Sequence, residues 1–422
     1  MDAAAKKPTF TRYEVFLIAV LAFMQFTVIL DFMVMAPLGA ILMPELKITP
    51  DQFSHVVSGY AFAAGISGIL AAGFADKYDR KKLLLFFYVG FLLGTLFCGL
   101  APSYGTLLAA RIVTGVFGGV VGSVSLAIIT DVFAPQVRGR VMGYVQLAFA
   151  LSQVAGITLG IFLATHLDWH APFLLIVGFA TVAGFVIFRF MRPVADHLEL
   201  QNDTTAFRHL LNTFLNRRHT TAFLTMMILA TGGFMMMPFS TAFLVNNVGV
   251  LEEQLPLVFI VVGACSMVTF PLVGRLSDKI GRLPTFIGGT LIAMTTTVLF
   301  SRFGPSPVWM VMAIYAISFV GISSRIVSSQ ALLTTIPNPR DRGAFSAITA
   351  SIQQLSGGLA AGLAGLIVVQ AGEHTPLRHY DTLGIVCACT MLTCVLLMFF
   401  VDRQVKRQLA AQAPMQETVR RA

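Results

Sequence analysis

Charged residues are scarce in this sequence. Asp, Glu, Lys and Arg make up 12% of its 422 residues, whereas hydrophobic residues make up 56%. An ordinary soluble domain carries about twice that share of charge, so the composition excludes that class. Uncharged runs longer than about 18 residues recur along the chain, and runs of this length are typical of transmembrane helices.

The polar chemistry of an enzyme or an ATP-driven pump is also missing. The eight histidines are scattered, without metal-ligand or catalytic-triad spacing. No Gly-x-x-x-x-Gly-Lys-Ser/Thr motif for ATP phosphates occurs. The five cysteines lie inside apolar runs and show no disulfide or metal spacing. We therefore expect no enzyme, no metal and no cofactor.

The apolar runs predict an all-α integral membrane protein with twelve transmembrane helices. The first run is too long for a cleavable signal peptide and has no small-residue cleavage site, so we interpret it as a retained span. The predicted spans are roughly residues 15–43, 53–74, 83–101, 105–133, 140–165, 171–192, 219–246, 253–274, 284–302, 307–335, 343–370 and 380–401.

The basic residues predict the orientation of these spans. Among the Lys and Arg outside the spans, only Lys47, Arg302 and Arg378 fall in odd-numbered loops. Positive residues stay on the cytoplasmic side, so we expect a multi-pass protein of the plasma (inner) membrane with both termini in the cytoplasm. The net charge of +9 is therefore a topology signal, and no clustered basic face indicates a nucleic-acid partner.

One long polar connection divides the chain. We expect residues 1–192 and 219–401 to form two six-helix bundles, joined by a cytoplasmic linker over residues 193–218 and followed by a poorly ordered tail over residues 402–422. Apolar residues recur at helical spacing in the linker, which predicts a short amphipathic helix on the membrane surface. These residues are Phe207, Leu210, Leu211, Phe214 and Leu215.

The two predicted bundles repeat each other at an offset of 202 residues. "ADKYDRKKLLL" around Asp76 matches "SDKIGRLPTF" around Asp278, and "PQVRGR" (135–140) matches "PNPRDR" (337–342). Paired glycines in the fifth and eleventh spans keep the same register. Two parallel six-helix repeats predict a pseudo-symmetric transporter with its site between the halves, which speaks against a channel built by oligomerisation.

Several motifs resemble those of the major facilitator superfamily. "GRLSDKIGR" (274–282) resembles its loop motif G-x-L-x-D-x-x-G-R, although the first copy has Ala72 and Asp79 in place of glycine. "LDFMVMAPLG" (30–39) resembles the first-span motif of the twelve-span drug:proton antiporter branch. "RIVTGVFGG" (111–119) is similar to the fourth-span Arg-x-x-x-Gly pattern.

The resemblance implies a function and leaves an alternative open. It implies proton-coupled efflux of a small organic compound or drug by alternating access, by a monomer in the lipid bilayer. The fifth span departs from the Gly-Pro-x-x-Gly-Gly motif of many antiporters, because "SQVAGITLG" (152–160) has no proline. The alternative keeps the fold and reverses the direction, with uptake of an organic anion, held by Arg111 and Arg325, or of a sugar-like solute.

Asp31 is the leading candidate for proton coupling. It lies midway along the first span with no charged neighbour in sequence, and a charge at that depth is costly unless it faces a wet cavity or a partner. Burial disfavours the charged form of a carboxylic acid, so Asp31 is suited to take up and release a proton. The alternative is a structural ion pair or a hydrogen bond to helix backbone.

Arg111 and Arg325 are the two cations expected inside spans. Arg111 is a plausible switch partner that holds Asp31 ionised, with a fixed salt bridge as the alternative. Gly115, Gly119 and Gly122 follow it at helical spacing, which predicts close approach of a neighbouring helix. Arg325 stands among serines in "VGISSRIVSSQ" and suggests a contact to an anionic substrate group, with snorkelling to the membrane surface as the alternative.

The loop motifs predict a conformational latch. The resemblance implies a charge cluster of Asp76, Arg80 and Asp131 that holds the halves outward-open and breaks on inward opening. Asp278 and Arg282 are the second copies, and position 333, the mate of Asp131, is Leu. We therefore expect the first latch to matter more.

Other polar residues in the spans are candidates for lining the substrate cavity, or for hydrogen bonds between helices. With Arg325, they are Gln25, Tyr60, Gln146, Gln153 and Gln353.

Overall fold

The computed structural model is helical, and one isolated β-bridge, between Val369 and Arg378, occurs outside its helices in the described chain. The structure describes residues 10–421 except 73, 153–155, 196–197, 199–205, 339–341 and 373–374. Ten helical segments of these described residues are long and apolar enough to cross a membrane. The predicted fifth span corresponds to two helices, α6 and α7, and the predicted eleventh span to α15.

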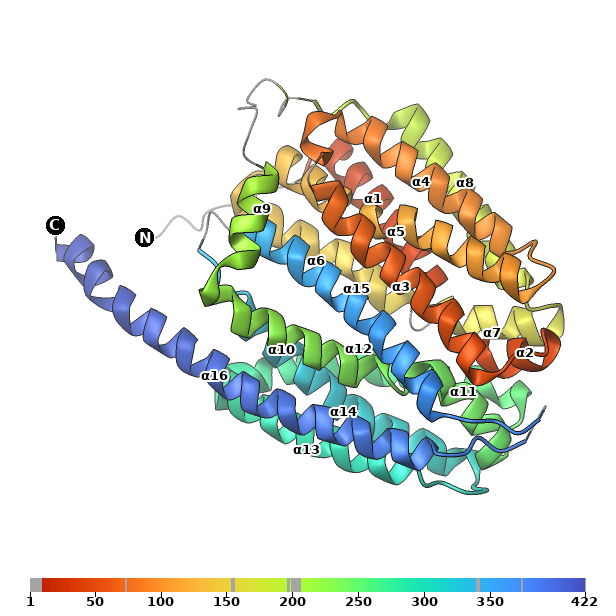
Figure 1. Cartoon of the computed structure of the whole chain (residues 1–422). Coiled ribbons are helices and arrows are strands. Elements are labelled where there is room, and N and C mark those ends of the chain that lie inside the picture. The colour runs from red at the N-terminus through yellow and green to blue at the C-terminus, as the bar shows by residue number, and fades with distance from the viewer. Residues whose placement is uncertain are drawn as a thin grey trace.

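The helices fall into two halves that lie one above the other in Figure 1. Those of the first half are α1 (Arg12–Val34), α2 (Gly39–Glu45), α3 (Pro50–Ala72), α4 (Arg80–Cys98), α5 (Tyr104–Val132), α6 (Pro135–Leu151), α7 (Ile157–His166) and α8 (Ala171–Phe190). Those of the second half are α10 (Arg217–Phe234), α11 (Ser240–Phe243), α12 (Leu255–Ile280), α13 (Arg282–Phe300), α14 (Val308–Leu333), α15 (Arg342–Ile367) and α16 (Tyr380–Arg421).

Prolines interrupt two of the predicted spans. Pro37 lies in the turn between α1 and α2, and Pro238 lies in the 3-10 turn η4 (Met237–Phe239) between α10 and α11. Proline lacks the backbone donor that helix continuation needs, so each span consists of a long helix followed by a short one. By contrast, α12 continues through Pro271.

Small residues set the spacing of helices within the first half. A Cβ on Gly115 would collide with the carbonyl oxygen of Tyr60, and one on Gly119 would collide with the backbone of Ala64. Glycine therefore allows α5 to approach the backbone of α3, as small residues do at helix interfaces in lipid. This confirms the packing predicted from the glycines after Arg111.

The two halves pack together mainly through α3 against α15 and α7 against α12. A Cβ on Gly65 of α3 would lie only 2.6 Å from the side chain of Leu355 on α15. Phe53 and Phe239 meet near the other end of α3, with ring centroids 6.1 Å apart. The halves are thus in contact along most of α3.

The linker helix α9 (Ala206–Leu215) connects both halves at the end of the molecule where α1 begins (Figure 1). It contacts α10 and α15 of the second half and α3 of the first half. Leu210 is buried in the cluster formed by α10, α15 and α16, whereas Phe214 and Leu215 remain exposed. The amphipathic helix predicted from the linker is therefore present.

The last helix extends into the C-terminal tail. Helix α16 continues beyond residue 401 to Arg421, and the predicted poor order of this tail stays a prediction. This segment is rich in Gln, Ala, Arg and Lys, which are strong helix formers. Lys406 pairs with Asp402 one turn earlier at 2.7 Å, and the Gln404 amide donates to the Arg218 carbonyl at 2.8 Å, which ties the extension to the start of α10.

Candidate functional site

An ion pair between Asp31 and Arg111 lies inside the first half. Arg111 Nη1 of α5 donates to Asp31 Oδ2 of α1 at 2.6 Å, and the two side chains are 1% and 0% exposed. The Thr95 hydroxyl of α4 donates to Asp31 Oδ1 at 3.3 Å. The Asp31 carboxylate therefore faces donors from two neighbouring helices, which supply the partner that a charge at this depth requires.

Tyr60 of α3 covers the Arg111 guanidinium. Arg111 Cζ lies 4.3 Å from the centre of the Tyr60 ring, and Tyr60 is 1% exposed. A desolvated cation–π contact of this kind contributes about 2 kcal/mol. In this closed arrangement Tyr60 is buried between Arg111 and Phe32, and its predicted place in a substrate cavity stays a prediction.

Phe32 connects this cluster to the second half. Its ring centroid lies 5.6 Å from that of Tyr60 and 6.0 Å from that of Phe234 on α10. Phe32 directly follows Asp31 in α1. Phe234 stands 202 residues later, so the two phenylalanines occupy equivalent positions in the repeat and meet each other between the halves.

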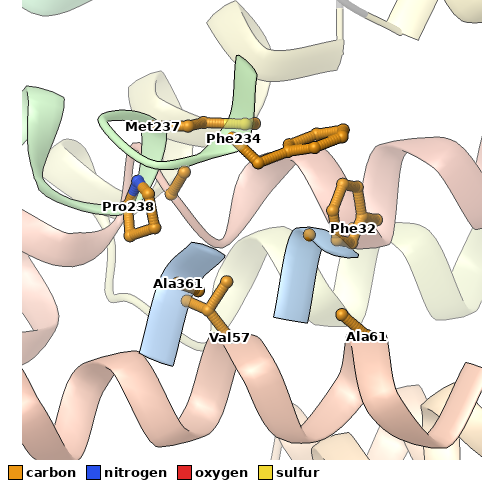
Figure 2. Close-up of a pocket in the computed structure, with 9 residues that line it drawn as sticks. Phe32, Val57, Ala61, Phe234, Met237, Pro238 and Ala361 are labelled. Carbon is orange, nitrogen blue, oxygen red and sulfur yellow. The ribbon is translucent and has the colours of Figure 1, made fainter. Parts of the chain in front are cut away.

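A small apolar cavity lies beside this aromatic pair (Figure 2). Its volume is about 20 Å³, which is room for about one water molecule. The halves are therefore closed at this level, and an organic substrate does not fit without their separation. The cavity is lined by Phe32, Ala36, Val57 and Ala61 from the first half and by Phe234, Met237, Pro238, Gly357 and Ala361 from the second.

Of the polar residues predicted for the substrate cavity, none that the structure describes lines this small closed cavity, and their place in an open site stays a prediction. The Gln25 amide sits against Gly122 of α5, and its buried Oε1 has no hydrogen-bond partner among the described residues. Gln353 is half-buried on α15. Arg325 is buried within the second half. The side chains of Gln146 and Gln153 lie outside the described residues.

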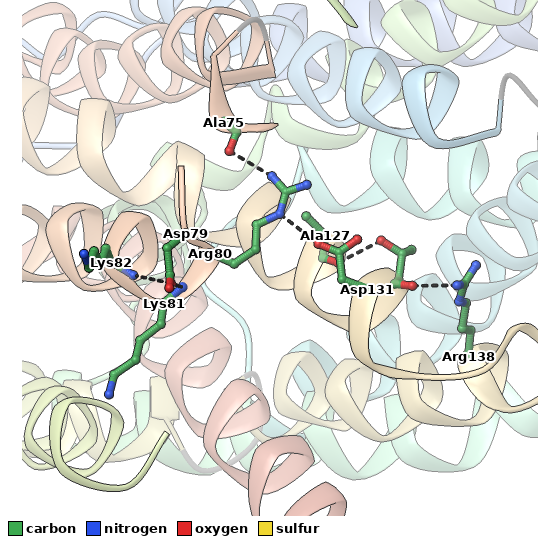
Figure 3. Close-up of polar contacts among 9 residues, drawn as sticks. Ala75, Asp79, Arg80, Lys81, Lys82, Ala127, Asp131 and Arg138 are labelled. Atoms are coloured by element: carbon green, nitrogen blue, oxygen red, sulfur yellow. Dashed lines mark hydrogen bonds and ion pairs between the residues drawn. The ribbon is translucent and has the colours of Figure 1, made fainter. Parts of the chain in front are cut away.

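The predicted first latch brings α4 and α5 together (Figure 3). Arg80 Nε donates to Asp131 Oδ2 at 2.9 Å, and Arg80 Nη1 donates to the Ala75 carbonyl at 2.9 Å. The Arg80 and Asp131 side chains are 6% and 23% exposed, so this ion pair is partly shielded from water. The side chain of Asp76, the third predicted member, lies outside the described residues.

Two further contacts brace the latch region. Asp79 caps α4, because its carboxylate accepts from the backbone nitrogens of Lys81 and Lys82 at 2.7 and 3.2 Å. Arg138 of α6 donates to the carbonyls of Phe133 and Thr130 at 2.8 and 2.5 Å, where α5 ends. Basic side chains at helix C-termini satisfy carbonyls that have no partner within the helix.

The second copy of the latch has no equivalent ion pair in the described part of the chain. Arg282 Nη1 donates to the Ala331 carbonyl near the end of α14 at 2.9 Å. Leu333 stands where the first copy has Asp131, and Asp278 is exposed. Gly281, the mate of Asp79, has a φ of 99°, a conformation that only glycine adopts easily. The two loops thus differ in backbone conformation at this position, since Asp79 has a φ of −54°.

Sequence reasoning missed Phe32, Phe234 and Thr95. The aromatic pair carried one usable signal, because "DFM" (31–33) and "GFM" (233–235) align at the repeat offset. Thr95 carried none, since a threonine inside a span usually bonds its own helix backbone, as Thr114 does with the Ala110 carbonyl at 2.8 Å.

Comparisons with known proteins agree with this architecture. A family model described as Major Facilitator Superfamily matches residues 21–241 and 222–421. The chain is 26% identical over 265 residues to the uncharacterized MFS-type transporter YceJ of Bacillus subtilis (strain 168), covering 62% of this chain and 67% of that protein. It is 30% identical over 153 residues to multidrug resistance protein 3 of the same organism, covering 36% of this chain and only 30% of that relative.

A solved structure shares the fold at low sequence identity. It is a bacterial homolog to the human lysosomal transporter Spinster in an inward-facing and unoccupied conformation. The TM-score is 0.74 at 16% identity, with 94% of this chain and 99% of that chain covered.

Proposed function

The chain belongs to the Major Facilitator Superfamily, and from this premise we propose that it is a proton-coupled exporter of small organic compounds. The observation that carries the proposal is the ion pair of Asp31 and Arg111, at 2.6 Å and shielded from solvent. An acid at this depth inside a transporter is a functional residue by default. The family makes the chain a multi-pass membrane transporter; proton coupling and export are our proposal.

The coupling step follows from the partners of Asp31. While Asp31 is ionised, its charge and that of Arg111 cancel. Protonation of Asp31 leaves the Arg111 cation without its counter-ion, and a buried unpaired cation is strongly disfavoured. Tyr60 stacks on that cation and touches Phe32, whose ring meets Phe234 of the second half. A shift of the guanidinium therefore acts on the contact between the halves.

Alternating access supplies the movement. We propose that residues 1–192 and 219–401 move as two bodies joined by the linker over residues 193–218, in a monomer with both termini in the cytoplasm. The Arg80–Asp131 pair joins the start of α4 to the end of α5 within the first half, and we propose that a rearrangement inside that half makes this pair in one of the two states and breaks it in the other. Because this pair is partly buried, we expect it to stabilise its state by more than the small free energy of a solvated surface ion pair.

The substrate class follows from the cavity lining. Phe32, Phe234 and Met237 border an otherwise aliphatic cavity between the halves. When the halves separate, this surface suits a lipophilic compound, because aromatic and methionine side chains adapt to varied apolar shapes. Similarity to a protein named for multidrug resistance supports this class.

Reconstituted vesicles test the proposal. Purified protein is placed in liposomes with an imposed pH gradient, and a panel of cationic, neutral and anionic lipophilic compounds is followed. We expect the native protein to move compounds in the direction opposite to proton flow. Asp31→Asn should transport them without coupling to protons, or not at all. The matched control is Asp168→Asn, an exposed acid in the loop before α8, which should behave as the native protein does. Proton coupling that survives Asp31→Asn would contradict the proposal.

The same assay separates export from uptake. Proton-coupled uptake of an organic anion would instead move compounds in the same direction as protons. In the structure Asp31 occupies Arg111, so the uptake alternative requires Asp31 to be protonated before an anion binds there.

A further inference from the structure

The second half contains a buried cation that has no counter-ion among the residues that the structure describes. Arg325 of α14 is 3% exposed, and its Nε and Nη2 atoms have no hydrogen-bond partner among the described residues. None of the acids that the structure describes pairs with it. The ionisable groups around it are the thiols of Cys387 and Cys394 on α16.

The neighbouring groups do not compensate this charge. The Cys387 thiol donates to the Gly232 carbonyl at 2.9 Å, so this sulfur is a neutral donor. The Cys394 sulfur is in hydrogen-bond contact with Arg325 and lies 3.9 Å from the Thr225 carbonyl, and as a thiol it carries no charge to pair with the guanidinium. The adjacent serine hydroxyls are used as well, since Ser324 donates to the Val320 carbonyl at 2.7 Å and Ser329 to the Ile326 carbonyl at 3.0 Å.

The ordinary ways of accommodating an arginine in a membrane do not apply here. Snorkelling requires the charged head to reach the membrane surface, but this side chain is buried inside the bundle. Loss of the proton is no solution either, because a guanidinium stays charged in proteins. A buried cation is tolerated only when an opposite charge with good hydrogen-bond geometry accompanies it.

We propose that Arg325 binds a small monovalent anion inside the second half. The shared chemistry is a compact negative charge that accepts from two guanidinium nitrogens, and it is met by a halide ion or by the carboxylate of a small organic acid. The bound anion would supply Arg325 with the counter-ion that Asp31 supplies to Arg111. The site goes beyond the proposed export function and does not depend on it.

Thermal unfolding of the purified full-length protein in detergent tests the site. The midpoint is measured in a buffer whose only anion is a bulky sulfonate, and then with chloride or acetate added. Mass action stabilises a protein that binds a ligand only when folded. We expect the small anions to raise the midpoint of the native protein by about 2 °C at tenfold the dissociation constant, and Arg325→Met to abolish the rise.

The comparison of variants gives a sharper result than the rise alone. In the sulfonate buffer Arg325→Met should be at least as stable as the native protein, because it removes an uncompensated charge. In saturating chloride the order should reverse. If Arg325→Met is less stable by the same amount in every buffer, Arg325 is a structural residue and the proposal is wrong.

Three additional measurements keep the test decisive. Arg302→Gln, an exposed arginine in a loop of the second half, should keep the full anion response, and an equal loss there would refute the assignment to Arg325. If Arg325→Met does not fold, Arg325→Lys should retain a weaker response, because the charge remains and the planar fork is lost; an unchanged response would contradict the site.

A response to acetate and not to chloride assigns a carboxylate, and the reverse assigns a halide. No response of the native protein to either anion overturns the proposal.

Discussion

The two halves solve the problem of a buried arginine differently. In the first half Arg111 has Asp31 at 2.6 Å and the Tyr60 ring at 4.3 Å. Arg325 of the second half has neither among the described residues, and it is not the repeat mate of Arg111, because Ala313 takes that place and Gly233 takes that of Asp31. The duplicated helices thus share packing but not electrostatics. A charge pair that the chain carries itself suits proton coupling, whereas an unpaired cation suits a ligand.

The largest expected effect is on stability and concerns the buried pair of Asp31 and Arg111, which has no equivalent at Arg325 among the described residues. Arg111→Met should destabilise the protein by about 3–5 kcal/mol, because removal of one partner leaves the other charge buried alone. The double variant Asp31→Asn/Arg111→Met should recover most of this loss, since no charge remains. Chemical denaturation in detergent, in parallel for the single and double variants, measures both. A double variant as unstable as the single one would mean that Asp31 and Arg111 do not act as a pair.

An intermediate effect compares the two latches. Asp131→Leu makes the first copy resemble the second, and the loss of a partly buried ion pair should shift the balance between the two conformations by about 1 kcal/mol, or about fivefold. Cysteine accessibility of a residue introduced between the halves reports this balance. The matched change Asp278→Leu should alter it little, because Asp278 is exposed and makes no ion pair within the described chain. Equal shifts would show that the latches are equivalent.

The smallest effect concerns the place where the repeats touch. Phe32→Leu and Phe234→Leu should each slow transport, and a double-mutant cycle on the transport rate should give a coupling of about 0.5–1.5 kcal/mol for the edge-to-face pair. Phe23→Leu serves as the control, because Phe23 lies on α1 away from this contact, with its ring against Phe26 and Phe179. Additive effects of the two changes would remove the aromatic pair from the mechanism.

The sequence predicted the ion pair but not the cavity, for a physical reason. Asp31 and Arg111 stand out because charge inside a membrane is expensive, and an acid and a base in one bundle tend to meet. The sequence does not single out the residues that line the cavity, Phe32, Phe234 and Met237. An apolar residue fits the sequence pattern equally well whether it faces a substrate, another helix or lipid. Tyr60 stands out in the sequence for its hydroxyl group, but its contact with Arg111 is made by its ring.

The latch loop shows the same limit at the level of the backbone. The missing glycine at position 79 looked like a departure from the family motif. In the structure Asp79 caps α4 with its carboxylate, and only Gly281 needs a positive φ. Residue types thus predicted the loop's position, while the backbone angles that make glycine necessary could be seen only in three dimensions.

The linker helix α9 rides on the second half while touching α3 of the first. A swing of one bundle against the other would change the contact between α9 and α3. We therefore expect a shorter linker, or a ligand bound to α9, to slow transport, although α9 holds none of the residues proposed for proton coupling or substrate binding.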